Sequence, residues 1–169
     1  AGGNALKASA YLARWDGAVL EVNDPYPNSP ADIKYREADA DYHVQNILYL
    51  PYRNVDAANH VLDTEEIKSA IMKYGAVYTA FKVNYSYFSD NQTNYYLPEN
   101  VRQYDGGHAV VIVGWDDHYP KTAFSEIAPG NGAFICKNSW GTGSGEDGYF
   151  YVSYYDKYIA RATCGDNNA

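Results

Sequence analysis

Two polar residues that could form a catalytic pair lie beside apolar segments in the second half of the chain. His108 opens the apolar run HAVVIVGW after two glycines, Gly106 and Gly107, and Asn138 follows the apolar run GAFIC. An amide oxygen can accept a hydrogen bond from one imidazole nitrogen, which orients the ring so that the other nitrogen faces a nucleophile. Trp140 could stack over that bond and keep water away from it. This spacing suggests acid–base chemistry in support of a nucleophile.

Taken singly, these residues also have structural explanations. A histidine at the start of a strand is more often structural than catalytic, and Asn138, Ser139 and Gly141 are common turn residues. The combination of an imidazole, an amide and an indole at this spacing favours the catalytic interpretation over two independent structural ones.

The chain contains two thiols, Cys136 and Cys164, and neither suits a nucleophile. Cys136 lies in an apolar run, where a thiol is usually buried and inert. On a strand it would also be about 6–7 Å along from Asn138. Cys164 lies in a polar tail. The two cysteines could form one disulfide or both be free, and they form no C-x-x-C metal pair.

The apolar patterns predict one antiparallel sheet or barrel with flanking helices. Helices are expected over 4–16, from Asn4 to the stop at Gly17, and over 64–75, with an apolar face of Ile67, Ala70, Ile71 and Tyr74. The expected strands cover 45–52, 76–83, 108–115, 132–140 and 149–155. Irregular structure is expected over 23–42, 84–107 and the glycine-rich turn 141–148.

Composition narrows the function classes. The 169 residues suffice for one domain, and 46% of them are hydrophobic. The net charge of −8 disfavours nucleic acid as a partner. No apolar run approaches the roughly 20 residues of a membrane span. We expect no metal site, because adjacent residues such as Asp116, Asp117 and His118 point to opposite faces of a strand and suit a solvated turn.

Two segments resemble the papain-like cysteine peptidases. They are GGHAVVIVGWDD at 106–117 and KNSWGTGSGEDGYFYVS at 137–153. The second carries the family pattern Asn-Ser-Trp-Gly-x-x-x-Gly-x-x-Gly-Tyr, which is long enough to make a chance match very rare. The residues in register with it are Asn138, Ser139, Trp140, Gly141, Gly145, Gly148 and Tyr149. The resemblance extends along nearly the whole chain, more loosely over 18–62 and 84–105.

The resemblance implies an α+β papain-like fold, represented by its antiparallel barrel-like half and part of its helical half. Residues 1–17 would be a remnant of the helical half, and 18–169 would be mostly the barrel-like half. The segment bearing the catalytic cysteine would precede residue 1. Its absence would leave an apolar face exposed, through which isolated chains could self-associate.

The resemblance also implies peptide hydrolysis through a Cys-His-Asn arrangement and a thioester, with His108 as the base and Asn138 orienting it. By itself, the chain would be inactive. Substrate would contact Gly2, Gly3, Ala80, Gly107 and Trp140. The small residues Ala80 and Gly107 would border a roomy pocket that favours a bulky apolar side chain two residues before the cut.

Two alternatives remain open at this level. The chain could be a non-catalytic peptide-binding pseudoenzyme module, although such a module has no need of an oriented imidazole. It could also be another Cys-His-Asn enzyme such as an acyltransferase, which the Trp-Gly motif disfavours. The expected partners are a peptide or protein substrate and the missing cysteine-bearing segment, with no cofactor. The family resemblance suggests a secreted or cell-surface protein.

Overall fold

The computed structural model describes residues 3–26, 39–59 and 61–161. The chain falls into two compact units, residues 1–49 and 50–169. The units divide further along the chain than the boundary between residues 17 and 18 that the sequence suggested for the two halves. The assignment of those halves stays a prediction.

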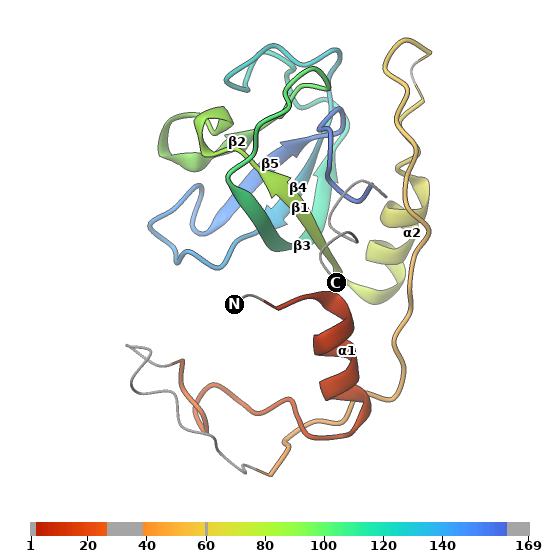
Figure 1. Cartoon of the computed structure of the whole chain (residues 1–169), viewed down its shortest axis with the longest axis vertical. Coiled ribbons are helices and arrows are strands. Elements are labelled where there is room, and N and C mark those ends of the chain that lie inside the picture. Colours follow the sequence, from red (N-terminus) through yellow and green to blue (C-terminus); the bar gives the residue numbers. More distant parts are fainter. Residues whose placement is uncertain (1–2, 27–38, 60, 162–169) are drawn as a thin grey trace. The chain divides into compact units, whose positions relative to one another are not determined.

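The second unit is built on a five-stranded sheet with the order β1-β3-β4-β5-β2. Long β3 pairs with β1 on one side and β4 on the other, and β4 pairs with β5; all three pairs are antiparallel, whereas β2 and β5 are parallel. Figure 1 shows these strands side by side. The strands are β1 (Val77–Val83), β2 (Asn94–Tyr95), β3 (Gly106–Asp116), β4 (Ala133–Lys137) and β5 (Tyr149–Ser153).

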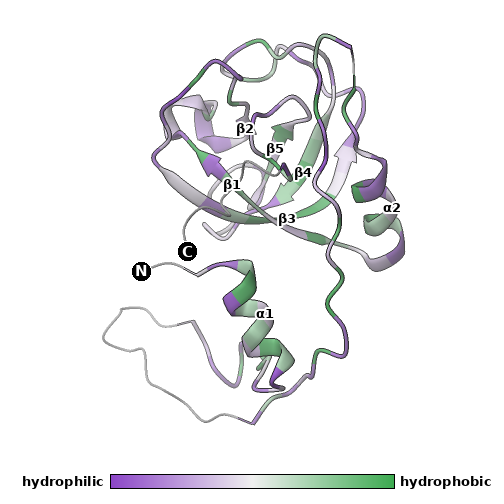
Figure 2. Cartoon of the chain, turned by 45° about the vertical axis from the view of Figure 1, so that its right-hand side comes forward, coloured by the Kyte–Doolittle hydropathy of each residue, from purple (hydrophilic) through white to green (hydrophobic). Residues whose placement is uncertain are grey.

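The core of this unit lies against one face of the sheet. Alternating residues of the strands point into it, and Figure 2 shows β4 and β5 as mostly apolar. Several of its members are completely buried, which stabilises the fold by about 1.5–3 kcal/mol for each large apolar side chain. These members include Phe81, Val83, Ile112, Phe134, Cys136, Phe150 and Val152.

One helix packs on the sheet. Helix α2 (Glu65–Tyr74) contacts β1 and β3 and buries Ile67, Ala70 and Ile71, as its sequence pattern predicts. Glu65 and Glu66 in its first turn suit the positive end of the helix dipole. Tyr74, which the pattern also placed on the apolar face, is 59% exposed because it lies in the last turn.

The first unit contains helix α1 (Ala5–Ala13), which begins at Asn4 as expected: the Asn4 side chain accepts a hydrogen bond from the Lys7 amide at 2.9 Å. The helix ends before the predicted residue 16. It is mostly apolar (Figure 2), yet none of its side chains is buried.

The predicted strand over 45–52 is wrong. The structure assigns no strand to this segment, and Leu48, Tyr49 and Tyr52 are more than half exposed. Its apolar and aromatic composition favours a strand, but a strand also needs a neighbour for its backbone groups.

The prediction of an irregular loop over 84–107 is also partly wrong. The segment holds two short 3-10 turns, η2 (Tyr85–Tyr87) and η3 (Asp90–Gln92), strand β2 and the first residues of β3. Glycines weaken strand propensity, so the sequence pattern missed Gly106 and Gly107, which pair with Val83 and Lys82.

Candidate active site

The antiparallel pairing of β3 and β4 brings His108 and Asn138 together. Val111 of β3 lies opposite Lys137, the last residue of β4, so the chain leaving β4 continues alongside the beginning of β3. The backbone amide of Asn138 donates to the Gly148 carbonyl at 2.9 Å, and this bond holds Asn138 at the base of the 141–148 loop. The pair separated by thirty residues in the sequence is thus placed by strand register.

The two side chains share a hydrogen bond of 3.0 Å between His108 Nε2 and Asn138 Oδ1. The same Asn138 oxygen accepts the Ser139 backbone amide at 2.8 Å. Because a backbone amide can only donate, this second contact identifies the atom as oxygen, and His108 Nε2 must therefore carry a proton. In the neutral ring, Nδ1 is left with its lone pair, available to take a proton from a nucleophile.

Aromatic rings enclose this bond. The Trp140 indole stacks on the imidazole, with ring centroids 4.6 Å apart and planes 24° from parallel. The Phe81 ring packs against the imidazole in an edge-to-face arrangement, with ring centroids 6.0 Å apart. The Phe88 ring packs on the indole, with centroids 5.7 Å apart. The rings exclude water from the His108–Asn138 bond, which strengthens it electrostatically.

Burial under these rings lowers the pKa of His108 below its ordinary value, because the desolvated imidazole holds a positive charge less readily. The hydrogen bond to Asn138 opposes this effect and raises the pKa, but burial is the larger influence. The pKa of the imidazole is thus held below its ordinary value, and the Asn138 side chain orients the ring.

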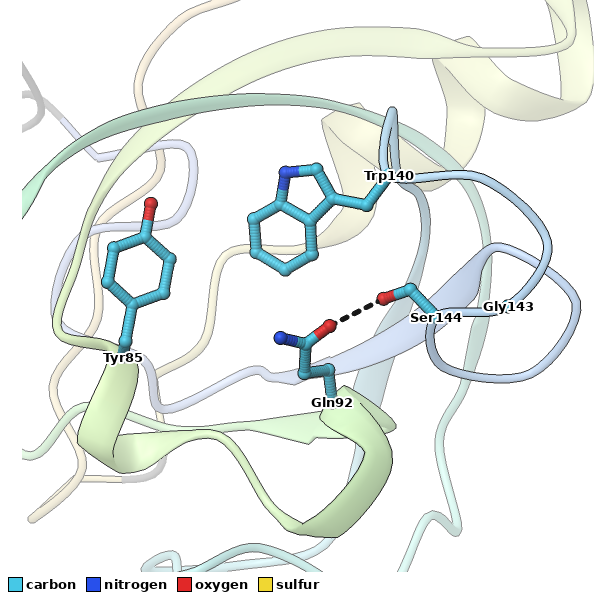
Figure 3. A pocket seen from close by; sticks show the side chains of 5 residues that line it. All are labelled: Tyr85, Gln92, Trp140, Gly143 and Ser144. Atoms are coloured by element: carbon cyan, nitrogen blue, oxygen red, sulfur yellow. Dashed lines mark hydrogen bonds between the residues drawn. The ribbon is translucent and has the colours of Figure 1, made fainter.

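A pocket of about 460 Å³ opens beside Trp140, and its side chains are shown in Figure 3. It is lined by Tyr85, Gln92, Trp140, Gly143 and Ser144. The Ser144 hydroxyl donates to Gln92 Oε1 at 2.7 Å, so the Gln92 amide nitrogen lies on the other side of that group, toward Tyr85. The pocket therefore combines aromatic faces with an amide donor.

The remaining site residues predicted from the sequence do not line the pocket beside Trp140. Ala80 and Gly107 lie on the neighbouring strands β1 and β3, where Ala80 pairs with Ala109 and Gly107 with Lys82. Ala80 is half-buried and Gly107 exposed, and their place beside a substrate pocket stays a prediction. Gly3 belongs to the first unit and is exposed, and Gly2 lies outside the described residues.

Cys136 is a free thiol with no exposed surface, and it lies in mid-sheet opposite Ile112 and Phe150. Burial raises its pKa far above the ordinary value, so the thiolate does not form at physiological pH. Cys164 lies outside the described residues.

The acidic residues at the end of β3 form polar contacts with neighbouring elements. Asp117 forms an ion pair of 2.8 Å with Lys68 of α2 and accepts the Tyr154 hydroxyl, and the His118 amide donates to Asp116. Across the described ranges, no cluster of three or more His, Cys, Asp and Glu side chains has the arrangement of a metal site.

Sequence reasoning missed the aromatic and polar residues of the 84–95 segment. Tyr85 and Phe88 contact the indole, and Gln92 lines the pocket, but the segment reads as a polar surface loop. The sequence pattern gave no signal for these three residues, whereas the alternation of β1 was a signal for another ring, Phe81, which lies on the same face as His108.

Comparison with known proteins gives consistent results. A family model described as papain family cysteine protease matches residues 1–168. A solved structure of the clostridial cysteine protease Cwp84 after propeptide cleavage superposes with a TM-score of 0.80 at 32% identity, over 96% of this chain and 39% of that one. A second structure, of the protease and lectin-like domains of Cwp84 from Clostridium difficile, gives a TM-score of 0.76 at 32% identity, over 92% and 33% of the two chains.

Among curated proteins, cathepsin J from Mus musculus is 24% identical over 151 residues, which are 89% of this chain and 40% of cathepsin J. The chain thus spans about two fifths of the length of this relative. In the part of the chain that the structure describes, neither helix is long and apolar enough to cross a bilayer.

Proposed function

The chain belongs to the papain family of cysteine proteases, and from this membership we propose that it supplies the histidine and asparagine of a peptidase. The observation that carries the proposal is the 3.0 Å bond between His108 Nε2 and Asn138 Oδ1 beneath the Trp140 indole. This bond leaves His108 Nδ1 as the nitrogen that exchanges protons during catalysis.

In the proposed reaction, His108 Nδ1 takes the proton of a cysteine thiol, and the thiolate attacks the peptide carbonyl carbon. The tetrahedral intermediate collapses to a thioester when the C–N bond breaks, and the imidazolium passes its proton to the leaving amine. Water then attacks the thioester, giving one proton to Nδ1, and the thiol leaves with that proton. Asn138 holds the ring in one orientation throughout.

We propose that the nucleophile comes from a segment other than the 169 residues of this chain. Cys136 is excluded by its complete burial and its raised pKa. The sequence disfavours Cys164, which lies in a polar tail, as the nucleophile. The chain alone is therefore expected to be inactive, and the cysteine-bearing segment is proposed as its first partner. The second is a peptide or protein substrate, and a secreted or cell-surface setting accords with the surface-layer association of Cwp84.

Two regions are proposed to contact substrate. Trp140, Tyr85 and Gln92 would receive the side chain on the leaving side of the cut, where an apolar body with an acceptor group at its end would suit the aromatic faces and the Gln92 amide. Ala80 and Gly107, with Gly2 and Gly3, would bind the acyl side. There we propose a bulky apolar preference two residues before the cut, and profiling on a peptide library would refute it by favouring small or charged residues.

The test of the function uses the full protein that contains this chain. It should cleave a fluorogenic peptide, lose activity after thiol alkylation, and fall by about two to four orders of magnitude in kcat on His108→Ala. The 169-residue chain alone should cleave nothing. If the full protein binds peptides without cleaving them, and binding survives His108→Ala, the pseudoenzyme alternative replaces this proposal.

A further inference from the structure

The loop that carries Trp140 is tied to the preceding η3 turn by a reciprocal pair of hydrogen bonds. The Gly145 amide donates to the Asn91 carbonyl at 2.8 Å, and Asn91 Nδ2 donates to the Gly145 carbonyl at 3.0 Å. The bond from Ser144 to Gln92, drawn in Figure 3, lies beside this pair. Two segments separated by about fifty residues are thus joined at one point, next to the base of the pocket.

The backbone on both sides of this contact has unusual φ angles. Asn91 and Gln92 have φ angles of 56° and 59°, in the left-handed region that costs a non-glycine residue on the order of 1 kcal/mol. Asparagine tolerates this region better than most residues. Gly145 has φ of 63°, and a Cβ there would lie 2.1 Å from the Tyr149 carbonyl oxygen, so only glycine brings the loop this close.

The same two segments meet again at the indole. Phe88 and Tyr85, which precede Asn91, lie 5.7 and 6.1 Å from the Trp140 ring, and Trp140 lies on His108. The position of the indole therefore depends on how the 84–95 segment is held against the 141–148 loop.

We propose that Asn91 is a positioning residue, whose paired bonds with Gly145 hold the 141–148 loop so that Trp140 covers the His108–Asn138 bond. The importance of the Asn91–Gly145 bonds for catalysis rests on the proposed function, but their effect on the His108 imidazole does not. The rings and amide that pack on His108 belong to Phe81, Asn138 and Trp140, which carry no charge. If the 141–148 loop is loosened, a change in the pKa of His108 would therefore indicate that water has reached the imidazole.

The experiment is an NMR pH titration of His108 in the 169-residue chain with the substitution Asn91→Gly. Glycine keeps the left-handed backbone without strain and removes only the side-chain donor. The pKa of His108 should rise toward its ordinary value, in the same direction as in Trp140→Ala, because the charged ring regains water. Asn59→Gly is the matched control, since it removes an asparagine side-chain donor from an exposed turn elsewhere in the same unit and should leave the His108 titration unchanged.

A second readout follows the indole directly. With Trp15 and Trp115 replaced by phenylalanine, the remaining Trp140 emission should be quenched more strongly by acrylamide in Asn91→Gly than in the unsubstituted background. Unchanged His108 titration and unchanged quenching in Asn91→Gly would overturn the proposal. Global unfolding of the variant, visible at all four histidines, would overturn it as well, because a residue that positions one loop must leave the sheet intact.

If the full enzyme is active, Asn91→Gly should lower kcat with little change in KM. If even the unsubstituted enzyme cleaves nothing, the proposed function fails, while the titration in the 169-residue chain still decides the role of Asn91.

Discussion

At the scale of single residues, the imidazole of His108 is under two opposed influences. Burial beneath Trp140 and beside Phe81 disfavours its charged form, whereas the hydrogen bond to Asn138 favours it. Because the two influences come from different side chains, single substitutions can separate them, which makes the ionisation of this ring the most direct test of the site.

The first prediction is that Asn138→Ala lowers the pKa of His108 further. The substitution removes the oxygen that accepts from Nε2 and leaves the burial by Trp140 in place. An NMR titration of the imidazole measures the change. Ser139→Ala is the control, because the side chain of Ser139 is exposed. A rise in the pKa would mean that Asn138 does not stabilise the charged ring.

Also at this scale, Asp156 is a completely buried carboxyl group whose pKa is raised from 3.8 to about 6, mainly by desolvation. Its oxygens accept the backbone amides of Leu97, Tyr158 and Ile159 at 2.8–3.0 Å, and these bonds oppose the rise. Since the folded state binds this proton more tightly than the unfolded state, the contribution of Asp156 to stability is largest below pH 3.8 and is lost as pH rises through about 6.

The second prediction is therefore that Asp156→Asn removes this dependence. Urea unfolding at several pH values between about 4 and 7 should show a smaller loss of stability with rising pH in the variant than in the parent chain. Asp56→Asn is the control with the opposite sign, because bonds from Asn59 lower the pKa of Asp56. Equal slopes for the parent and Asp156→Asn would contradict the prediction.

At the scale of elements, the described residues between Leu50 and Leu62 pair only in an isolated bridge of Asp56 with Val61, and Arg53 anchors the segment. The Arg53 guanidinium donates to the Ile159 carbonyl at 2.9 Å and the Leu62 carbonyl at 3.1 Å, and it lies 5.1 Å from the Phe134 ring centre. Burial lowers its pKa to about 10, which leaves it charged at neutral pH. One buried side chain thus ties the segment to the rest of the unit, together with the bond from the Arg53 backbone amide to the Ala160 carbonyl at 3.1 Å.

The third prediction is that Arg53→Ala lowers the free energy of unfolding by on the order of 3 kcal/mol, because the buried Ile159 carbonyl and the part-buried Leu62 carbonyl lose their donor. Arg53→Met should cost less, since it restores apolar contact with Phe134. Chemical denaturation measures both, and hydrogen exchange should increase first over 50–62. The exposed Arg102→Ala is the control, expected to change stability by less than about 0.5 kcal/mol. A similarly small effect of Arg53→Ala would refute the anchoring role.

At the scale of the whole molecule, the first unit exposes many large apolar side chains. Leu6 is 71% exposed, Val22 82% and Leu48 62%, and helix α1 buries none of its side chains. Exposed apolar surface of this kind is usually covered by a partner. A second copy of the chain would provide such cover.

The fourth prediction is that the isolated chain self-associates through the first unit. Sedimentation velocity should show mass increasing with concentration, and Leu6→Lys should reduce the increase. Met72→Lys is the matched control, because Met72 is exposed to a similar degree, 78%, on the second unit. A single monomeric boundary at all concentrations would contradict the prediction.

The sequence by itself determined the elements with strong local signals. These are helix α2 and strands β1, β3, β4 and β5, because hydrophobic periodicity is a property of short stretches of chain. A long motif identified the papain family for the same reason. Tertiary structure alone decided that 45–52 forms no strand, and it brought the 84–95 segment against the indole. It also aimed His108 Nε2 at Asn138. Each of these outcomes depends on which distant backbone or side chain is available as a partner, and that information lies in the fold and not in any local pattern.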